Sequence, residues 1–368
     1  MRIGWEGAFF SYHSLSIINR EVVSRLLKRG YDIHPENTEA EQFAPTSNSC
    51  QIIKRAMNSF SPSVSNDYDV HIRLKWPPSF EKKGKKNILN QPWEFGPIPK
   101  LWVEGLANID RVIAISNFVK YCFLISGYNN VDVIPCGVDT EKFNPDAPPL
   151  ELETNKRFKF LFVGGVIARK GIDVLIKSYL ATFTRKDDVC LVIKGMGSES
   201  FYKHMSVKND ILKLAEDKFM PEIIYLEDDI PDEKMPSLYT ACNAFVYPFR
   251  GEGFGMPILE AIACGLPVIV TGYGPVLDYL PKHYEYFLKY KIKISNVNVM
   301  ADGRELVGNW FLAEPDFIDL RNKMKEVYNN YDKAKDIIDG IRKQISISHS
   351  WNNIASMYEK KIIEVYES

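Results

Sequence analysis

The sequence predicts an α/β fold with two domains, each built on a parallel sheet. Short β-branched runs alternate with helical patterns throughout the chain, as they do in parallel α/β proteins. At 368 residues the chain is long enough for two domains of ordinary size. Two segments after residue 150 also have the order strand, glycine-bearing loop and helix, an arrangement that can bind an anion.

The first domain is predicted to span residues 1–150. Its clearest helix is Ser14–Arg29, which ends at Gly30. Residues 90–100 predict an irregular loop, because prolines and glycines interrupt any regular pattern there. We expect its strands at Arg2–Trp5, Tyr31–His34, Val70–Leu74, Asn87–Leu89, Arg111–Ser116 and Val131–Pro135.

The second domain is predicted to span residues 151–349. It follows the proline-rich, polar segment Asn144–Leu150, which has the composition of a linker. A helix is expected at Ile172–Tyr179, and an amphipathic helix at about Trp351–Tyr366 ends the chain. We expect strands at Lys159–Val163, Cys190–Lys194, Glu222–Leu226, Ala244–Tyr247 and Val268–Thr271.

Composition and charge exclude some classes of protein. A net charge of −1 argues against a nucleic-acid partner, which would require a clear basic excess. The six cysteines form no C-x-x-C pair and suit a reducing compartment, and no apolar run reaches the ~18 residues of a membrane span. We therefore expect a cytoplasmic protein. The lysine cluster Lys82–Lys86 is a solvated loop by default, and peripheral contact with anionic lipid of the inner membrane face is the alternative.

The most informative segment is Glu252–Glu260, in which two carboxylates enclose a Gly-Phe-Gly turn and a proline. Pro257 suits the first turn of a helix, and the apolar run Ile258–Cys264 stops at Gly265. The loop would present backbone N–H groups at a positive helix end, where an anion or a sugar can bind. Two solvated glutamates on a helix surface are the alternative interpretation.

The stretch from Glu252 to Thr271, EGFGMPILEAIACGLPVIVT, closely resembles the E-x7-E motif of retaining glycosyltransferases with the GT-B fold, glycosyltransferase family 4. The resemblance implies two Rossmann-like domains with parallel sheets that face a central cleft, with the C-terminal helix at about 350–368 packed on the first domain. It also implies that Glu260 binds the donor ribose. The catalytic-site residue Glu252 would hold the donor hexose together with the backbone amides of Gly253, Phe254 and Gly255.

The second phosphate signal is the loop Gly164–Gly171, between a predicted strand and a predicted helix. Arg169 and Lys170 would add cations at its mouth, although a solvated basic turn is the alternative. The family usually has G-R-L-x-x-x-K-G here, with its arginine and lysine on the donor diphosphate. Lys170 matches the lysine, whereas Gly165 stands at the arginine position. Whether Arg169 supplies the missing charge is left open.

The first domain offers further candidates. Gly7, on the loop after the first strand, matches a family glycine that lets the loop approach the donor phosphates. His71 lies in a predicted central strand, and many family members carry an active-site histidine near the end of this strand. A structural histidine is the alternative, and His13 on the first loop is the other candidate.

These features predict a glycosyltransferase that moves a hexose from a UDP-, GDP- or dTDP-sugar to a glycan, glycolipid or protein acceptor. The resemblance implies retention of anomeric configuration, no cofactor and no metal ion. An epimerase or phosphorylase of the same fold, and a non-catalytic nucleotide-sugar-binding protein, are the alternatives. A dehydrogenase is poorly supported because the chain lacks a G-x-G-x-x-G fingerprint.

Overall fold

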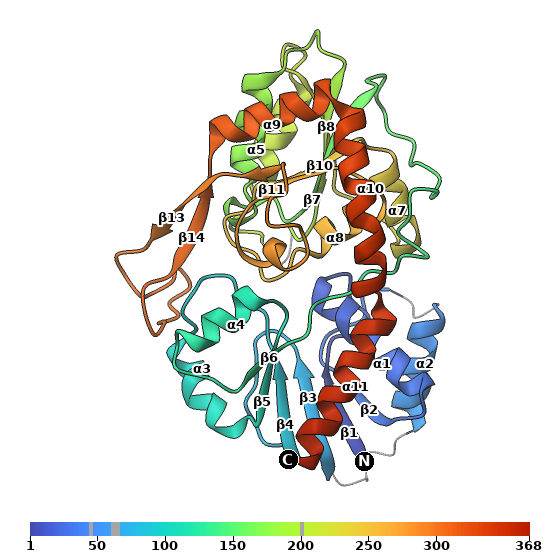
Figure 1. Cartoon of the computed structure of the whole chain (residues 1–368), viewed down its shortest axis with the longest axis vertical. Coiled ribbons are helices and arrows are strands. Elements are labelled where there is room, and N and C mark those ends of the chain that lie inside the picture. Colours follow the sequence, from blue (N-terminus) through green and yellow to red (C-terminus); the bar gives the residue numbers. More distant parts are fainter. Residues whose placement is uncertain (44–46, 60–66, 199–201) are drawn as a thin grey trace. The chain divides into compact units, whose positions relative to one another are not determined.

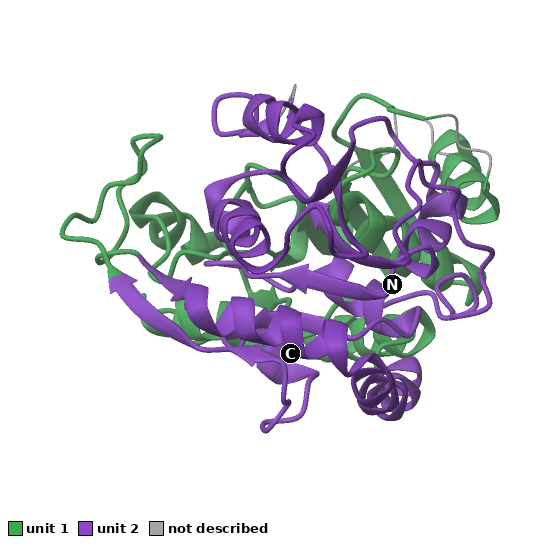
Figure 2. Ribbon diagram, turned by 90° about the horizontal axis from the view of Figure 1, so that it is seen from above, with its two compact units in different colours: residues 1–137, 294–310, 349–368 green, residues 138–293, 311–348 purple. Residues whose placement is uncertain are grey.

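The computed structural model describes residues 1–43, 47–59, 67–198 and 202–368, which form two compact units. Unit 1 comprises residues 1–137, 294–310 and 349–368, and unit 2 comprises residues 138–293 and 311–348 (Figure 2). Each unit contains a six-stranded parallel sheet with helices, so the predicted α/β class with two parallel sheets is confirmed.

The sheet of unit 1 has the strand order β2-β1-β3-β4-β5-β6. Its central strands are buried along almost their whole length, as expected for a parallel sheet. The strands are β1 (Arg2–Gly7), β2 (Asp32–Asn37), β3 (Tyr68–Leu74), β4 (Gly84–Asn90), β5 (Arg111–Ala114) and β6 (Val131–Val133).

Two helices far apart in the sequence lie side by side in unit 1. Figure 1 shows the C-terminal helix α11 (Trp351–Glu367) beside α1 (Ser14–Lys28). The Trp5 ring of β1 lies 5.8 Å from the Tyr358 ring of α11, and the Trp5 indole donates to Asn19 of α1 over 2.8 Å. The remaining helices of this unit are α2 (Asn48–Ser59), α3 (Lys100–Gly105), the 3₁₀ turn η1 (Leu106–Asn108) and α4 (Asn117–Leu124).

Residues 294–310 belong to unit 1 because they hydrogen-bond to it and pack on its aromatic side chains. The Val307 N–H donates to the carbonyl oxygen of Ile98 over 3.0 Å. The Arg304 guanidinium lies 5.2 Å from the centre of the Trp76 ring and 5.4 Å from that of Trp93. The predicted division at residue 150 did not anticipate this segment, whose contacts in unit 1 are far away in the sequence.

The sheet of unit 2 has the order β12-β11-β10-β7-β8-β9, so the strand order reverses between β7 and β10. This is the doubly wound arrangement of dinucleotide-binding folds. The strands are β7 (Phe158–Gly164), β8 (Val189–Gly195), β9 (Glu222–Leu226), β10 (Ala244–Tyr247), β11 (Val268–Thr271) and β12 (Phe287–Leu288). A separate two-stranded sheet pairs β13 (Tyr290–Ile294) with β14 (Phe311–Pro315).

Helices of unit 2 connect its strands, and the predicted linker packs within this unit. The Leu150 N–H donates to the carbonyl oxygen of Ser237 over 2.8 Å. None of the helices in the described part of the chain is long and apolar enough to cross a membrane. The helical elements are η2 (Ala168–Lys170), α5 (Ile172–Thr182), α6 (Lys208–Glu216), η3 (Asp232–Lys234), α7 (Met235–Thr240), α8 (Met256–Ala263), η4 (Gly274–Asp278), α9 (Phe317–Asn329) and α10 (Tyr331–Ser348).

Candidate functional site

The two predicted anion-binding loops of unit 2 follow neighbouring strands. The loop after β7 carries Arg169 and Lys170, and the loop after β10 carries Glu252. These two strands are adjacent and parallel, and they flank the point where the strand order reverses. Ligands of open parallel sheets bind outside the carboxyl ends of the strands at this point. The topology therefore brings both loops to the expected ligand position.

A glycine allows the two loops to approach closely. Gly171, just before α5, has a φ of +77°, and a Cβ atom there would lie 1.8 Å from the carbonyl oxygen of Pro248. Any other residue would be strained at this φ and would also push the loops apart. The Arg250 N–H donates to the Arg169 carbonyl oxygen over 2.8 Å, which ties the same loops together.

Lys170 and Glu252 form an ion pair between the two loops. Their side chains are only 13% and 11% exposed, and the Tyr247 hydroxyl donates to Glu252 over 3.3 Å. Burial alone would raise the pKa of Glu252, but Lys170 and Arg169 outweigh burial and lower it. Burial alone would lower the pKa of Lys170, but the Glu252 charge raises it. Both groups are therefore charged at neutral pH.

Arg169 lies beside this pair, and Gly165 leaves the family arginine position without a side chain. A Cβ atom on Gly165 would lie 2.4 Å from Cε2 of Tyr202, so that ring fills the space. The Arg169 Nη1 atom donates to the carbonyl oxygen of Gly251 over 2.8 Å. Its charge also contributes to the lowered pKa of Glu252. The proposed replacement of the family arginine by Arg169 stays a prediction.

The turn Gly253–Gly255 is anchored by Phe254. This residue is 2% exposed, and its ring lies 5.4 Å from that of Tyr279. The Tyr279 hydroxyl donates to the Phe254 carbonyl oxygen over 3.2 Å. Because Gly255 directly precedes α8, the anchor also fixes where this helix begins.

Glu260 lies on α8 with a different set of neighbours. The hydroxyl of Tyr239, on α7, donates to a Glu260 carboxylate oxygen over 2.7 Å. Burial raises the pKa of Glu260 to about 7, while the Tyr239 hydrogen bond acts in the opposite direction. The carboxylate therefore changes its charge near neutral pH, unlike Glu252.

In unit 1, Gly7 and His71 lie on neighbouring strands. A Cβ atom on Gly7 would lie 2.6 Å from the carbonyl oxygen of Leu74 and 2.3 Å from the Asn19 amide, so only glycine fits. His71 is fully buried, and its Nδ1 atom lies 3.0 Å from the Arg73 guanidinium, which can only donate. Burial, with a smaller effect of Arg73, lowers the pKa of His71 to about 3, so the ring is neutral with its proton on Nε2.

The face of the sheet that contains His71 is charged. Residues 75–83 connect the parallel strands β3 and β4 without a helix, and the Arg73 guanidinium donates to the Ser79 carbonyl oxygen of this connection over 2.9 Å. Ligand atoms of Glu6, Glu36 and His71 lie within 4.8 Å of one another. The Lys83 ammonium already lies 3.1 Å from Glu6 and 3.2 Å from Glu36, so a cation of the chain fills this cluster.

His13, the other histidine candidate, is engaged at the start of α1. Its Nδ1 atom accepts the Ser16 N–H over 3.3 Å, and its Nε2 atom lies 2.8 Å from a Glu39 oxygen. This geometry gives His13 a structural role as the N-cap of the helix.

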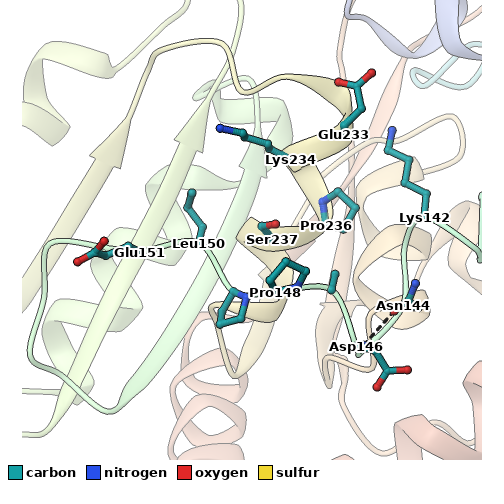
Figure 3. Close-up of a pocket in the computed structure, with 12 residues that line it drawn as sticks. Lys142, Asn144, Asp146, Pro148, Leu150, Glu151, Glu233, Lys234, Pro236 and Ser237 are labelled. Atoms are coloured by element: carbon teal, nitrogen blue, oxygen red, sulfur yellow. Dashed lines mark hydrogen bonds between the residues drawn. The ribbon is translucent and has the colours of Figure 1, made fainter. Parts of the chain in front are cut away.

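An open groove of about 830 Å³ lies elsewhere in unit 2, between the linker and the start of α7 (Figure 3). Lys142, just before the linker, and Asn144 line it on one side, and Glu233 and Ser237 line it from the opposite side. The described residues that line this groove include none of the predicted donor-binding residues. The groove is therefore not the predicted donor position.

Sequence reasoning missed several residues that contact the predicted ones, and three of them surround the two glutamates and the loops. Tyr239 and Tyr247 donate to Glu260 and Glu252, and Arg250 joins the two loops. No spacing or motif marks these residues, since both tyrosines lie in apolar patterns and Arg250 lies two residues before the motif.

Comparisons with known proteins identify the family and the fold. The family model "Glycosyl transferases group 1" matches residues 146–344. The chain is 23% identical over 256 residues to the phosphatidylinositol N-acetylglucosaminyltransferase GPI3 subunit of Saccharomyces cerevisiae, covering 67% of this chain and 54% of the relative. It is 30% identical over 202 residues to a D-inositol 3-phosphate glycosyltransferase of an Arthrobacter species, covering 51% and 46%. The chain thus spans about half the length of these curated relatives.

A solved structure resembles the whole chain. The sucrose-phosphate synthase of Thermosynechococcus elongatus aligns with a TM-score of 0.72 and 16% identity, and the alignment covers 100% of both chains. At this identity the likeness shows the fold, which is the GT-B fold predicted above. Since the family model covers more than half of the sequence, including both loops of the site, the chain belongs to the group 1 glycosyl transferases.

Proposed function

We propose that the protein transfers a hexose-type sugar from a nucleotide-sugar donor to a glycan, glycolipid or protein acceptor, with retention and without a metal ion. The observation that carries the proposal is the Lys170–Glu252 ion pair at the strand-order reversal of unit 2. Membership of the family supports the reaction class, and the spacing of Glu252 and Glu260 supports assignment to glycosyltransferase family 4.

Donor binding would exchange the partners of the ion pair. A diphosphate carries more charge than one carboxylate and would attract the Lys170 ammonium, with Arg169 as the second cation. Glu252 and the amides of Gly253–Gly255 would then hold hydroxyl groups of the hexose, and Glu260 would accept hydrogen bonds from the ribose. The donor would be a UDP-, GDP- or dTDP-sugar.

The same cations would serve the chemical step. Negative charge grows on the diphosphate as the bond to the sugar breaks, and fixed positive groups nearby stabilise it. Lys170, Arg169 and the N-terminus of α5 together would supply this charge, which is the role a metal ion has in other transferases. No cofactor is required for this reaction.

In unit 1 we retain His71 as a catalytic candidate and Gly7 as the glycine that would let its loop approach the donor phosphates. A neutral imidazole with its proton on Nε2 would offer a hydrogen-bond donor and not a cation. We also propose that the protein works in the cytoplasm, at the inner membrane face if its acceptor is a lipid. The Lys82–Lys86 cluster is not the solvated loop that the sequence indicated, because its second half lies in β4 and Lys83 and Lys85 pair with carboxylates of unit 1.

The test is release of nucleoside diphosphate from a panel of UDP-, GDP- and dTDP-sugars, with and without candidate acceptors. We expect one base to be preferred, and Lys170→Ala to lower turnover by about 10²-fold or more. Lys177→Ala is the matched control, because Lys177 is an exposed residue of α5. Conversion of the nucleotide-sugar to another nucleotide-sugar, without release of nucleoside diphosphate, would favour an epimerase. Cleavage of a glycan by inorganic phosphate would favour a phosphorylase, and binding without turnover would favour a non-catalytic protein.

A further inference from the structure

Arg250 uses every N–H group of its guanidinium in the structure. Nη1 and Nη2 donate to the two carboxylate oxygens of Asp173 over 2.7 and 2.9 Å. Nε and Nη2 donate to the two oxygens of Glu314 over 2.8 and 2.9 Å. The second proton of Nη1 is donated to the carbonyl oxygen of Ala168. The side chain is 14% exposed, so these five bonds are largely shielded from water.

The backbone of Arg250 is fixed as well. Its N–H donates to the Arg169 carbonyl oxygen, and its carbonyl oxygen accepts the Ala313 N–H, each over 2.8 Å. One residue therefore joins three segments of unit 2: the loop that leads into α5, the loop after β10, and β14.

These contacts surround the ion pair of the site without including it. Lys170 follows Arg169, whose carbonyl oxygen Arg250 holds, and Glu252 lies two residues after Arg250. Asp173 lies in the first turn of α5, so the pairing also fixes this helix end. The Lys293 ammonium, 3.1 Å from Glu314, balances the second carboxylate of the network.

We propose that Arg250 is a positioning residue that holds Lys170 where the donor diphosphate requires it and Glu252 where the donor hexose requires it. The proposal rests on the proposed function. A lysine at this position cannot replace the arginine, because three donors on one ammonium cannot form two bidentate pairs. Small misplacements of binding groups cost up to about 10²-fold in activity, so this register matters to the reaction.

The test separates the diphosphate from the rest of the nucleotide. Binding of UDP, GDP and dTDP, and of the matching nucleosides in competition, is measured for the unaltered protein and for Arg250→Lys. In Arg250→Lys we expect the dissociation constant of the preferred diphosphate to rise by about tenfold. The dissociation constant of its nucleoside should stay within about twofold, because Arg250 contacts neither Glu260 nor Tyr239 in the described hydrogen bonds.

A double-mutant cycle adds a second readout. If Arg250 acts through Lys170, Arg250→Lys should change the diphosphate dissociation constant by no more than about twofold in a Lys170→Met background. Glu314→Gln keeps the pair between Arg250 and Asp173. The dissociation constant of the diphosphate should therefore also rise in this variant, but by less than in Arg250→Lys. Arg185→Lys, at an exposed position, is the control.

Each other outcome overturns the inference. If Arg250→Lys leaves the dissociation constant of the nucleoside diphosphate unchanged, Arg250 has no positioning role, while the proposed function stands. If the nucleoside and the diphosphate lose affinity equally, the substitution has destabilised unit 2 in general and Arg250 does not act on the diphosphate site alone. If the unaltered protein binds none of the three diphosphates, the proposed function and the inference fail together.

Discussion

Replacing Lys170 by methionine should destabilise unit 2 strongly at neutral pH. The substitution leaves the Glu252 carboxylate, 11% exposed, with the Tyr247 hydroxyl at 3.3 Å and the nearby charge of Arg169. Removing one partner of a buried ion pair typically costs about 3–5 kcal/mol, since the remaining charge stays buried without its counterion. For a unit of roughly 200 residues this corresponds to a melting temperature lower by about 6–20 °C.

The pH dependence of this effect follows from the lowered pKa of Glu252. A carboxylate whose pKa is lowered by folding stabilises the folded state above its unfolded pKa, and this contribution is lost as the pH falls through the folded pKa. The stability difference between the unaltered protein and Lys170→Met should therefore be fully present above the unfolded pKa of about 4.5. It should shrink as acidification protonates Glu252, first in the variant, where burial acts without the Lys170 charge.

Scanning calorimetry at several pH values measures both effects. The double variant Lys170→Met/Glu252→Gln removes both charges and should regain most of the lost stability, because the buried site then holds no unpaired charge. Lys177→Met serves as the control. A melting temperature of Lys170→Met within about 2 °C of the unaltered protein at pH 7 would refute the ion-pair reasoning.

Other expected outcomes test the remaining features. Nucleotide affinity should rise by roughly tenfold between pH 6 and pH 8, because Glu260, whose pKa is raised to about 7, must lose its proton to accept hydrogen bonds from the ribose hydroxyls. Titration calorimetry with Glu260→Gln should show no such pH dependence. If the dependence persists in this variant, another group than Glu260 causes it. Gly171→Ala should prevent stable folding or cost several kcal/mol in denaturant unfolding, since its Cβ atom would lie 1.8 Å from the Pro248 carbonyl oxygen; near-native stability would mean that the loops can separate. Chelation with EDTA should leave turnover largely intact, and a full loss restored by Mg²⁺ would contradict the metal-free mechanism.

The sequence predicted those parts of the site that depend on residues close together in the chain. The glycine turn, the proline and the apolar run of residues 252–265 specify a loop followed by a helix, and α8 begins at Met256 as the pattern indicates. Lys170 was marked by its place between a strand and a helix. These features depend on neighbours within about ten residues, where backbone propensities act.

The contacts that fix the site could not be predicted in this way. Arg250 pairs with residues 77 and 64 positions away, and nothing in its own segment indicates either partner. The strand pattern around His71 was found, but the charged connection of residues 75–83 on that face was not. The same holds for residues 294–310, whose place in unit 1 rests on Arg304 and the distant side chains of Trp76 and Trp93.

The central claim is tested most directly by a thermal-shift screen against UDP, GDP, dTDP and their common sugar conjugates, with Glu260→Ala and the exposed control Glu216→Ala beside the unaltered protein. We predict a stabilising shift with one base, kept in Glu216→Ala and lost in Glu260→Ala. A shift of equal size in Glu260→Ala would contradict the assignment of the donor ribose to this carboxylate, and no shift with any nucleotide would contradict a donor site at the Glu252–Glu260 segment.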